Sequence, residues 1–374
     1  MIHSTSAEGR PVVAILTTSH PVKQFRGNRR NFRDLIRAGG ELGCLVYVVT
    51  VRDLRLEETD IIGYVPGPGR RNWNTEIMPL PQVVYNRIPS REQESKPAVL
   101  RKIGELLEHP SIRLFNPRFF NKWDLFEWLK GSRATARHVP ETRKLRSAAT
   151  LKALLKNHSS LYLKPEAGKA GKGIMRLKYV PDHPLPYRLQ VQSGQRHLTY
   201  KAASMERLWN RISRERGQER YIVQQAIDLS SYRGRPFDLR VLVQKNGRGV
   251  WGVTGIGARL AGARSITTHV PRGGSIEEPG KLLDNVFGAE KSAAILRSVP
   301  AAALLIARQI ERASASALGE MSMDLGVDRE GGLWFFEANS RPMKFDEPPI
   351  RRLSLERIIQ YSRHLAGHPI EARR

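Results

Sequence analysis

Cysteine is almost absent from this sequence, since Cys44 is the only one among 374 residues. A single thiol excludes an internal disulfide framework and is typical of a reducing compartment, so we expect a cytoplasmic protein. Long hydrophobic runs are missing too. The richest run, at 299–307, is short and alanine-heavy, whereas a membrane helix needs roughly 18 apolar residues. The N-terminus lacks the charged-then-apolar pattern of a signal peptide, and we expect no transmembrane segment.

Acidic residues are scarce, with 36 Asp and Glu against 62 Lys and Arg and a net charge of +26. Such a surplus suits an anionic polymer, an anionic surface or a polyanionic substrate as partner. The basic residues are spread along the chain, with no long basic tail and no basic run interleaved with aromatics. This distribution favours general adhesion to something acidic over specific nucleic-acid recognition.

Short apolar strands alternate with helical patterns in the first third of the chain. This alternation predicts an α/β domain over residues 1–117. The rest of the chain is long enough for a further domain. There the patterns predict helices at 121–130, 151–157, 293–318 and 354–366, and strands at 160–164, 174–179, 221–227, 236–244 and 251–259.

A glycine-rich loop, GKAGKG at 168–173, follows the predicted strand that ends at Lys164. A P-loop would need a Ser or Thr after its lysine to bind Mg²⁺ through the hydroxyl. Here Ile174 follows, and the chain resumes a strand where a P-loop opens a helix. The loop therefore predicts a phosphate site whose metal ligands come from elsewhere.

The segment MDLGVDREGGLWFFEANSRP, at 323–342, offers those ligands. Two apolar runs flank the turn-forming residues DREGG, a pattern that predicts a β-hairpin. Two carboxylates opposed in a hairpin repel each other unless a cation lies between them, and hard oxygen ligands select Mg²⁺ or Mn²⁺. The alternative is a surface hairpin whose polar residues face water.

The position of the turn decides whether the ligands converge. A two-residue turn at 330–331 places Asp324 directly opposite Glu337, with Asn339 on the same face. A turn at 331–332 would pair Asp324 with Asn339 and preserve that face. A three-residue turn would break it.

A lysine-bearing strand, a glycine-rich loop between strands, a D-x-R strand and a D…E-x-N hairpin follow one another along the chain. This order resembles the ATP-grasp superfamily, and within it the YheC/YheD-type endospore-coat-associated proteins of spore-forming bacteria. The resemblance spans nearly the whole chain. Besides the hairpin, it is carried by PLPQVVYNRIPSREQE from Pro79, FNPRFFNKWDLFEWL at 115–129, VPET at 139–142, LYLKPEAGKAGKGI at 161–174, YIVQQAI at 221–227 and RPFDLRVLVQK at 235–245.

The resemblance implies an α/β N-terminal domain followed by an α+β ATP-grasp fold at 118–350, whose two lobes clasp ATP. It also implies a C-terminal helix at 351–374 packed on that domain. ATP, with Mg²⁺ or Mn²⁺, is the implied cofactor. One or two metal ions would be held by Asp324, Glu337 and Asn339.

The resemblance further implies a role for each remaining candidate residue. The α- and β-phosphates would be contacted by Lys122 and Lys164. The loop backbone would close over the β- and γ-phosphates at Gly168, Gly171 and Gly173. The adenine would be lined, mostly through backbone groups, by Gln224, Gln225 and Ile227. The transferring phosphoryl group would be stabilised by Arg240 and Arg259.

The implied activity is Mg²⁺-dependent ligation of a carboxylate to an amine, or less often a thiol, through an acylphosphate. The resemblance also implies a part in spore-coat or envelope formation, and the basic surface suits acidic or envelope-derived substrates. The first alternative is a non-catalytic basic coat or envelope protein that retains the fold. The second is a nucleic-acid-binding protein. The complete set of metal ligands favours catalysis.

Overall fold

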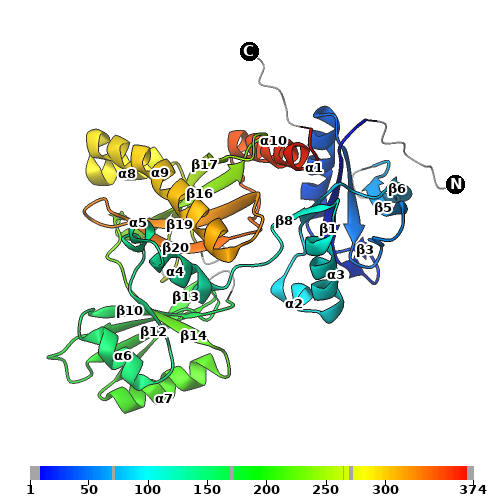
Figure 1. Ribbon diagram of the computed structural model, residues 1–374. Coiled ribbons are helices and arrows are strands. Elements are labelled where there is room, and N and C mark those ends of the chain that lie inside the picture. The colour runs from blue at the N-terminus through cyan, green and yellow to red at the C-terminus, as the bar shows by residue number, and fades with distance from the viewer. Residues whose placement is uncertain (1–8, 70–71, 169–171, 264, 269–272, 369–374) are drawn as a thin grey trace.

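Three six-stranded β-sheets with flanking helices form the chain in the computed structural model (Figure 1). The structure describes residues 9–69, 72–168, 172–263, 265–268 and 273–368. The N-terminal sheet lies beside the other two, and the sheet of residues 142–225 lies below the sheet of residues 231–339 in Figure 1. The predicted α/β domain followed by an α+β fold is the observed order.

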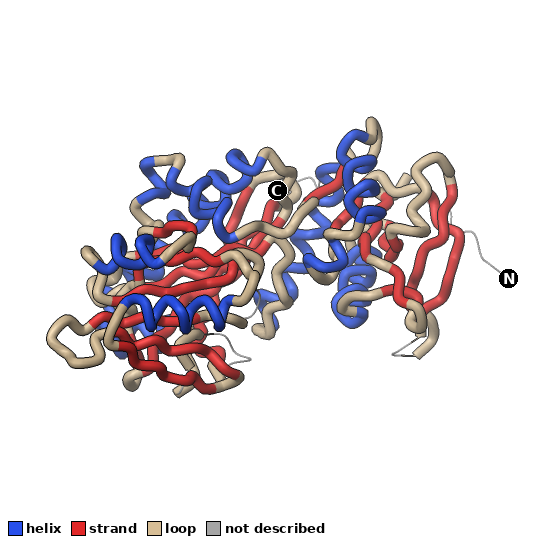
Figure 2. The backbone as a smooth tube through the Cα atoms, turned by 90° about the horizontal axis from the view of Figure 1, so that it is seen from below, coloured by secondary structure: helices blue, strands red, loops and turns tan. Residues whose placement is uncertain are grey.

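The N-terminal sheet has the strand order β6-β5-β4-β1-β7-β8, in which β4, β1, β7 and β8 run parallel. Its centre is β1, which is buried along its whole length, as expected of a parallel strand covered on both faces. Figure 2 shows helices on both sides of this sheet. Its elements are β1 (Val12–Thr17), α1 (Arg29–Glu41), β4 (Leu45–Thr50), β5 (Asp60–Pro66), β6 (Trp73–Pro79), β7 (Val83–Asn86), α2 (Arg91–Glu94), α3 (Pro97–Glu108) and β8 (Arg113–Phe115), beside the small pair β2 (Ser19–His20) and β3 (Gln24–Phe25).

The second sheet is antiparallel, in the order β13-β12-β11-β10-β14-β9. Alternation along β10 buries Leu161 and Leu163 against the helices and leaves Tyr162 and Lys164 on the opposite face. Its elements are β9 (Thr142–Lys144), α6 (Ala148–Leu155), β10 (Ser160–Pro165), β11 (Met175–Tyr179), β12 (Tyr187–Ser193), β13 (Arg196–Ala202), α7 (Met205–Arg216) and β14 (Tyr221–Gln225).

The third sheet, in the order β18-β17-β16-β19-β20, carries the predicted hairpin at its edge, and β15 pairs with β16. The two longest strands of this sheet, at residues 235–245 and 251–260, contribute to the largest apolar core of the molecule. The elements are α4 (Lys122–Lys130), α5 (Arg133–Ala136), β15 (Ser231–Tyr232), β16 (Arg235–Lys245), β17 (Trp251–Leu260), β18 (Ser275–Glu277), α8 (Pro279–Phe287), α9 (Ala289–Ser314), β19 (Glu320–Val327) and β20 (Leu333–Asn339).

Helix α9 is the one described helix that is long and apolar enough to cross a membrane, by length and composition alone. Core helices of globular proteins pass the same test, so this is weak evidence. One face of α9, with Val299, Ala303 and Ile306, is buried in the core of the third sheet. The helix therefore has a packing role in the fold as it stands.

The last helix, α10 (Pro348–Leu365), lies between the N-terminal sheet and the third sheet (Figure 1). Arg351 forms an ion pair with Asp34 of α1 at 2.8 Å, and Tyr361 packs edge-on against Phe115 of β8. On the other side, a Cβ at Gly255 of β17 would lie 2.4 Å from Ile350. The helix thus contacts both neighbours, while the domain limits at residues 117 and 350 stay a proposal.

A buried polar junction joins the N-terminal sheet to the third sheet. Asn116, held at φ +55°, donates to the carbonyls of Glu320 and Ser340 and accepts from the Gly319 amide at 2.8 Å. The Glu320 carboxylate in turn accepts from the Tyr85 hydroxyl and from Arg87 at 3.1 Å. Because such buried groups are expensive to leave unpaired, the junction fixes how the two sheets meet.

Two adjacent glycines of α1 provide a matched test of its packing on β4. A Cβ at Gly39 would lie 2.1 Å from Val46, whereas a Cβ at Gly40 would meet nothing within 4 Å. We expect Gly39→Ala to lower the free energy of unfolding by roughly 1–3 kcal/mol through overpacking. Gly40→Ala should instead raise it by up to about 1 kcal/mol through helix propensity. Urea unfolding of both variants checks this, and equal effects would contradict the close contact.

Candidate functional site

The predicted hairpin exists, but its turn is not the predicted one. The amide of Asp328 donates to the carbonyl of Gly332 at 3.0 Å, which leaves a three-residue turn with Gly331 at φ +89°. A glycine in this conformation is typical of three-residue hairpin loops. The Asp328 carboxylate holds the turn by accepting from the Gly332 amide and from the indole of Trp334, each at 2.7 Å.

A β-bulge compensates for the longer turn. Leu325 pairs with Phe335, whereas the preceding residue, Asp324, pairs with Glu337. Phe336 is therefore the extra residue on β20. The bulge restores the face that a three-residue turn alone would have broken. The predicted pairing of Asp324 with Glu337 is therefore present, although the predicted turn at 330–331 is wrong.

Buried Arg259 bridges two carboxylates beside the hairpin. Its guanidinium binds Asp238 through two hydrogen bonds of 3.0 Å and lies 2.6 Å from the Asp324 carboxylate. Burial alone lowers the pKa of Arg259, but the charges of Asp238 and Asp324 outweigh it and raise that pKa overall. Thr268 also donates its hydroxyl to Asp238. Arg259 is thus held in place before any ligand arrives.

Arg240 lies opposite Asp324 in the pairing of β16 with β19 but has neutral partners. Its guanidinium donates to the Ser322 hydroxyl at 3.4 Å and lies 5.6 Å from the ring centroid of Phe345. Asp238 lies on the same strand face, two residues before Arg240, but its carboxylate binds Arg259 of the neighbouring strand β17. Arg240 is accordingly the less constrained of the two arginines.

Lys122 is buried at the first position of α4. Its ammonium lies 2.9 Å from a carboxylate oxygen of Glu337 and donates to the carbonyl of Gly168 at 3.4 Å. One side chain therefore connects Glu337 of β20 to Gly168, the first glycine of the loop. Its burial distinguishes Lys122 from an ordinary surface lysine at the start of a helix.

Lys164 approaches the same place from β10. Its ammonium donates to the amide oxygen of Gln224 at 2.6 Å and lies 5.4 Å from the ring centroid of Phe336, the bulged residue. Burial, and to a lesser extent the charge of Lys122, lower the pKa of Lys164 to about 8, although the nearby carboxylates of the third sheet oppose the shift. An anionic group beside Lys164 would relieve both effects.

The glycine-rich loop is fixed at its two described ends. A Cβ at Gly173, whose φ is +72°, would lie 2.7 Å from the Tyr221 hydroxyl, which donates to the Gly173 carbonyl at 2.9 Å. A Cβ at Gly168 would come within 3.0 Å of Pro165. Both positions therefore favour glycine. Gly171 lies outside the described residues.

The side chains of the predicted adenine-binding segment are engaged within the protein. Gln224 is fully buried, and its amide nitrogen donates to the Thr142 hydroxyl at 2.9 Å. The Gln225 amide oxygen accepts from the backbone of Glu141 at 3.1 Å, and Ile227 lies half-buried beyond the end of β14. Contact with a base would therefore use backbone groups, as expected.

Three residues at this site were not predicted: Asp238, Phe336 and Thr142. Asp238 had a visible signal, since it shares a strand face with Arg240 in the D-x-R motif. The role of Phe336 depends on the bulge, and that of Thr142 on the pairing of β9 with β14. Neither the bulge nor the pairing of β9 with β14 can be read from one segment alone.

The donors present fit a hard cation bound together with phosphate. In the described part of the chain, no group of three His, Cys, Asp or Glu side chains forms a metal site by itself. Asp324 and Glu337 face each other, and Asn339 lies two residues further along the same strand. Mg²⁺ is commonly bound by one or two carboxylates, with phosphate oxygens and water completing its shell. Two carboxylates and an amide beside two lysines meet that requirement.

Comparisons with known proteins agree with this geometry. A family model described as YheC/D like ATP-grasp matches residues 111–365. The endospore coat-associated protein YheD of Bacillus subtilis is 28% identical over 379 residues, which cover 99% of this chain and 82% of that protein. The endospore coat-associated protein YheC of Bacillus subtilis is 22% identical and covers 83% of this chain and 84% of that protein.

Solved structures show the same fold at low identity. The ATP-grasp ligase PsnB, complexed with a minimal precursor, aligns with a TM-score of 0.53 and 12% identity over 95% of this chain and 99% of its own. D-alanyl-alanine synthetase A from Vibrio cholerae aligns with a TM-score of 0.52 and 13% identity over 97% of this chain and 99% of its own. The ATP-grasp fold expected from the motifs is confirmed.

Glu337→Gln tests the ion pair with Lys122. The substitution keeps the shape of the side chain but leaves the buried ammonium of Lys122 without its carboxylate neighbour. Since Glu337 is partly exposed, we expect a loss of roughly 1–3 kcal/mol in the free energy of unfolding without nucleotide, below the value for a fully buried pair. Lys122→Met combined with Glu337→Gln should recover part of the loss. Unchanged or higher stability in Glu337→Gln would contradict the pair.

The depressed pKa of Lys164 predicts a pH dependence. With a folded-state pKa of about 8 and an unfolded value of about 10.4, the unfolded chain holds more protons between these limits. The free energy of unfolding gains a contribution that rises with pH across that window. The difference in stability between the wild type and Lys164→Met should therefore rise from pH 8 to 10 and stay flat below pH 7. Lys178→Met, at an exposed lysine of the same sheet, is the control, and a flat difference throughout would refute the assignment.

Proposed function

The chain belongs to the YheC/D-like ATP-grasp family, and we propose that it is a Mg²⁺-dependent ATP-binding ligase that joins a carboxylate to an amine, or less often to a thiol. ATP-grasp ligases in general use ATP and a divalent metal. The observation that carries the proposal is the pairing of Asp324 with Glu337 directly beside Lys122. A nucleoside triphosphate with its bound metal needs cationic side chains for the phosphates and carboxylates for the metal at one place.

The proposed reaction has two transfers. A carboxylate oxygen of the first substrate attacks the γ-phosphorus of ATP, the bond to the β–γ bridging oxygen breaks, and ADP leaves with that electron pair. The amine nitrogen of the second substrate then attacks the acyl carbon. The carbon–oxygen bond to phosphate breaks, phosphate leaves, and the amine gives up one proton. Bound Mg²⁺ would supply charge neutralisation at the phosphates.

The role that we propose for each residue follows from its charge and its position in the site. We assign phosphate binding to Lys122 and Lys164, which reach the site from α4 and β10. The glycines at 168, 171 and 173 let backbone amides approach the β- and γ-phosphates. Because Arg240 has neutral partners, it is free to follow charge on the transferring group, whereas Arg259 is already bound to Asp238 and Asp324. Arg259 would then stabilise the site mainly by holding these carboxylates.

The remaining binding roles follow the same scheme. Backbone groups of the segment at Gln224, Gln225 and Ile227 would line the adenine. Asp324, Glu337 and Asn339 would hold one or two Mg²⁺ ions, or Mn²⁺ in their place. No general base is assigned, because an amine that enters in its neutral form can lose its proton to water or to the departing phosphate.

We also propose association with the spore coat or envelope, because two relatives bear endospore coat-associated names. Acidic or envelope-derived substrates suit the net charge of +26. The second candidate function is a non-catalytic basic coat protein that retains the fold. The intact lysine and carboxylate cluster favours the ligase, since adhesion through charge alone needs no such arrangement.

Lys164→Ala separates the two candidates. Loss of a charge-assisted phosphate contact there should weaken Mg²⁺–ATP binding by about 10- to 150-fold. Lys178→Ala removes an equal charge from the exposed face of β11 and should leave the affinity unchanged. Calorimetric titration of ATP and of a polyanion at fixed salt measures both effects.

A screen of acids and amines for ADP release, including acidic peptides and cell-wall fragments, then tests for catalysis. Equal ATP affinity in the wild type and Lys164→Ala, with unchanged polyanion binding, would reject the ligase in favour of a scaffold.

A further inference from the structure

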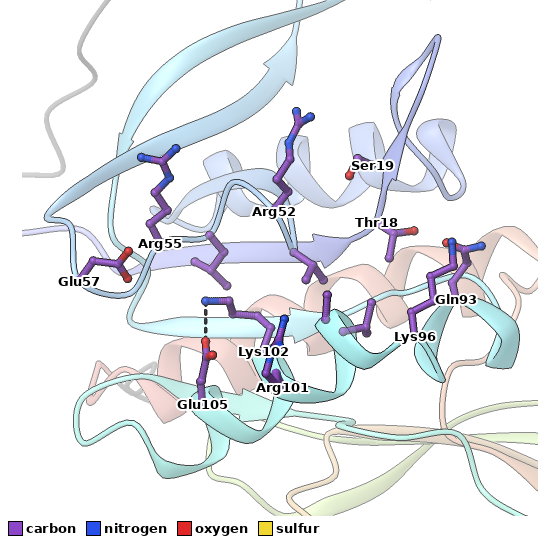
Figure 3. A pocket seen from close by; sticks show the side chains of 14 residues that line it. Thr18, Ser19, Arg52, Arg55, Glu57, Gln93, Lys96, Arg101, Lys102 and Glu105 are labelled. Atoms are coloured by element: carbon purple, nitrogen blue, oxygen red, sulfur yellow. Dashed lines mark ion pairs between the residues drawn. The ribbon is translucent and has the colours of Figure 1, made fainter.

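A cavity of about 440 Å³ lies at the edge of the N-terminal sheet (Figure 3). Thr18 and Ser19, which follow β1, line one part of it, and Arg52 and Arg55, which follow β4, line another. Helices α2 and α3 close it from the other side. It has no residue in common with the candidate nucleotide site, so nothing argued above accounts for it.

The topology explains why a cavity forms here. Helix α1 packs with Val13 and Ile15 on one face of the sheet, and α3 packs with Ala14 and Leu16 on the other. The strand order turns at β1, with β4 on one side and β7 on the other. A crevice is expected outside the carboxyl ends of parallel strands at such a switch point, where α/β sheets commonly bind ligands.

The hydroxyl of Thr18 is the first sign of a ligand. Thr18 is only 6% exposed, and its hydroxyl oxygen is buried without a hydrogen-bond partner. In Figure 3 this oxygen points toward the end of the cavity where Gln93 and Lys96 lie. Gln93 is itself 7% exposed. A buried hydroxyl left unpaired costs roughly 1–3 kcal/mol, which an acceptor atom in the cavity would offset.

The N-terminus of α3 is the second sign. The helix has 12 residues and begins at Pro97, and its N-cap residue Lys96 makes no side-chain capping bond. Its first turn lines the cavity through Ala98 and Val99. Pro97 has no amide hydrogen and the Val99 amide donates to the Lys96 carbonyl at 2.9 Å, so this N-terminus attracts an anion through the Ala98 amide and its partial positive charge.

The charge of the lining points the same way. Cations outnumber carboxylates by five to two around the cavity, counting Arg52, Arg55, Lys96, Arg101 and Lys102 against Glu57 and Glu105. Three of the five cations already have carboxylate partners: Lys102 pairs with Glu105 at 2.6 Å (Figure 3), Arg52 with Asp53 at 3.1 Å and Arg55 with Glu58 at 2.9 Å. The positive charge offered to a ligand therefore rests mainly on Lys96 and Arg101. Lys96 and Arg101 have exposed side chains that can swing toward a bound group.

We propose that this cavity binds a small acid that carries at least two negative charges, on carboxylates or on phosphate. The Thr18 hydroxyl and the Gln93 amide would donate to one charged end, beside Lys96, and Arg101 would neutralise the other. Apolar side chains between them, such as Leu54 and Val99, would pack against the carbon skeleton. The volume falls within the roughly 300–1,000 Å³ of small-molecule sites. The proposal is independent of the ligase function.

Calorimetric titration without nucleotide or Mg²⁺, at fixed ionic strength, tests the site with two probes. L-glutamyl-L-glutamate represents carboxylates and inorganic pyrophosphate represents phosphates. Thr18→Val should weaken binding of the preferred probe by about fivefold through the lost donor. Lys96→Ala combined with Arg101→Ala should weaken it by at least about tenfold. Lys178→Ala combined with Arg214→Ala removes the same charges from exposed positions elsewhere and should change nothing.

Two further measurements keep the result decisive. The melting temperature of Thr18→Val should equal or exceed that of the wild type, because the substitution removes an unpaired buried hydroxyl. Binding of the probe should persist in Lys164→Ala, which separates this cavity from the phosphate-binding lysines and separates its failure from that of the ligase proposal. No binding of either probe to the wild type, or equal affinity in the cavity variants and their control, would overturn the proposal.

Discussion

The placement of Asp324 against Glu337 is the constraint on which the candidate site depends. Two carboxylates in directly opposed positions on neighbouring strands repel each other unless cations compensate. The fold supplies a cation to each of them from a different element, Arg259 from β17 to Asp324 and Lys122 from α4 to Glu337. The helix, the long strand and the hairpin must therefore meet at one place for the sheet to be stable. The same convergence forms the site that we propose for phosphate and metal.

Lys164 shows that a side chain placed for ligand binding can reduce the stability of the unliganded protein. Lys164 is brought beside Lys122 in a site where burial already disfavours its charge, so that its pKa falls to about 8. The unliganded protein tolerates this arrangement because Gln224 and the ring of Phe336 contact the ammonium. A polyanion that binds there would contact the ammonium groups of both lysines, and its negative charge would relieve the repulsion between them. The unfavourable proximity of two like charges would favour an anionic ligand in the proposed function.

The junction at Asn116 and Glu320 fixes the N-terminal sheet against the site. Burial raises the pKa values of Glu320 and Tyr85, so these groups favour a shared hydrogen bond over separate charges. Near this junction, Arg341, two residues beyond Asn339, forms a buried ion pair with Glu94 of α2. Gln93, which directly precedes Glu94, lines the cavity at the edge of the N-terminal sheet. The proposed anion site is thus connected to the segment that follows β20 through helix α2 and the ion pair between Arg341 and Glu94.

The sequence by itself determined the order of strands and helices, because apolar periodicity is a local property that each segment carries. It also predicted that Asp324 faces Glu337, but from a two-residue turn that is wrong; the facing is kept by the bulge at Phe336, which the sequence did not reveal. Only the tertiary structure decided that Asp238 binds Arg259 and leaves Arg240 to Ser322, since ion-pair partners depend on which strands become neighbours. The same holds for the pKa of Lys164 and for the buried hydroxyl of Thr18. Burial and charge at a point in space are set by segments far apart in the chain, and no pattern within one segment records them.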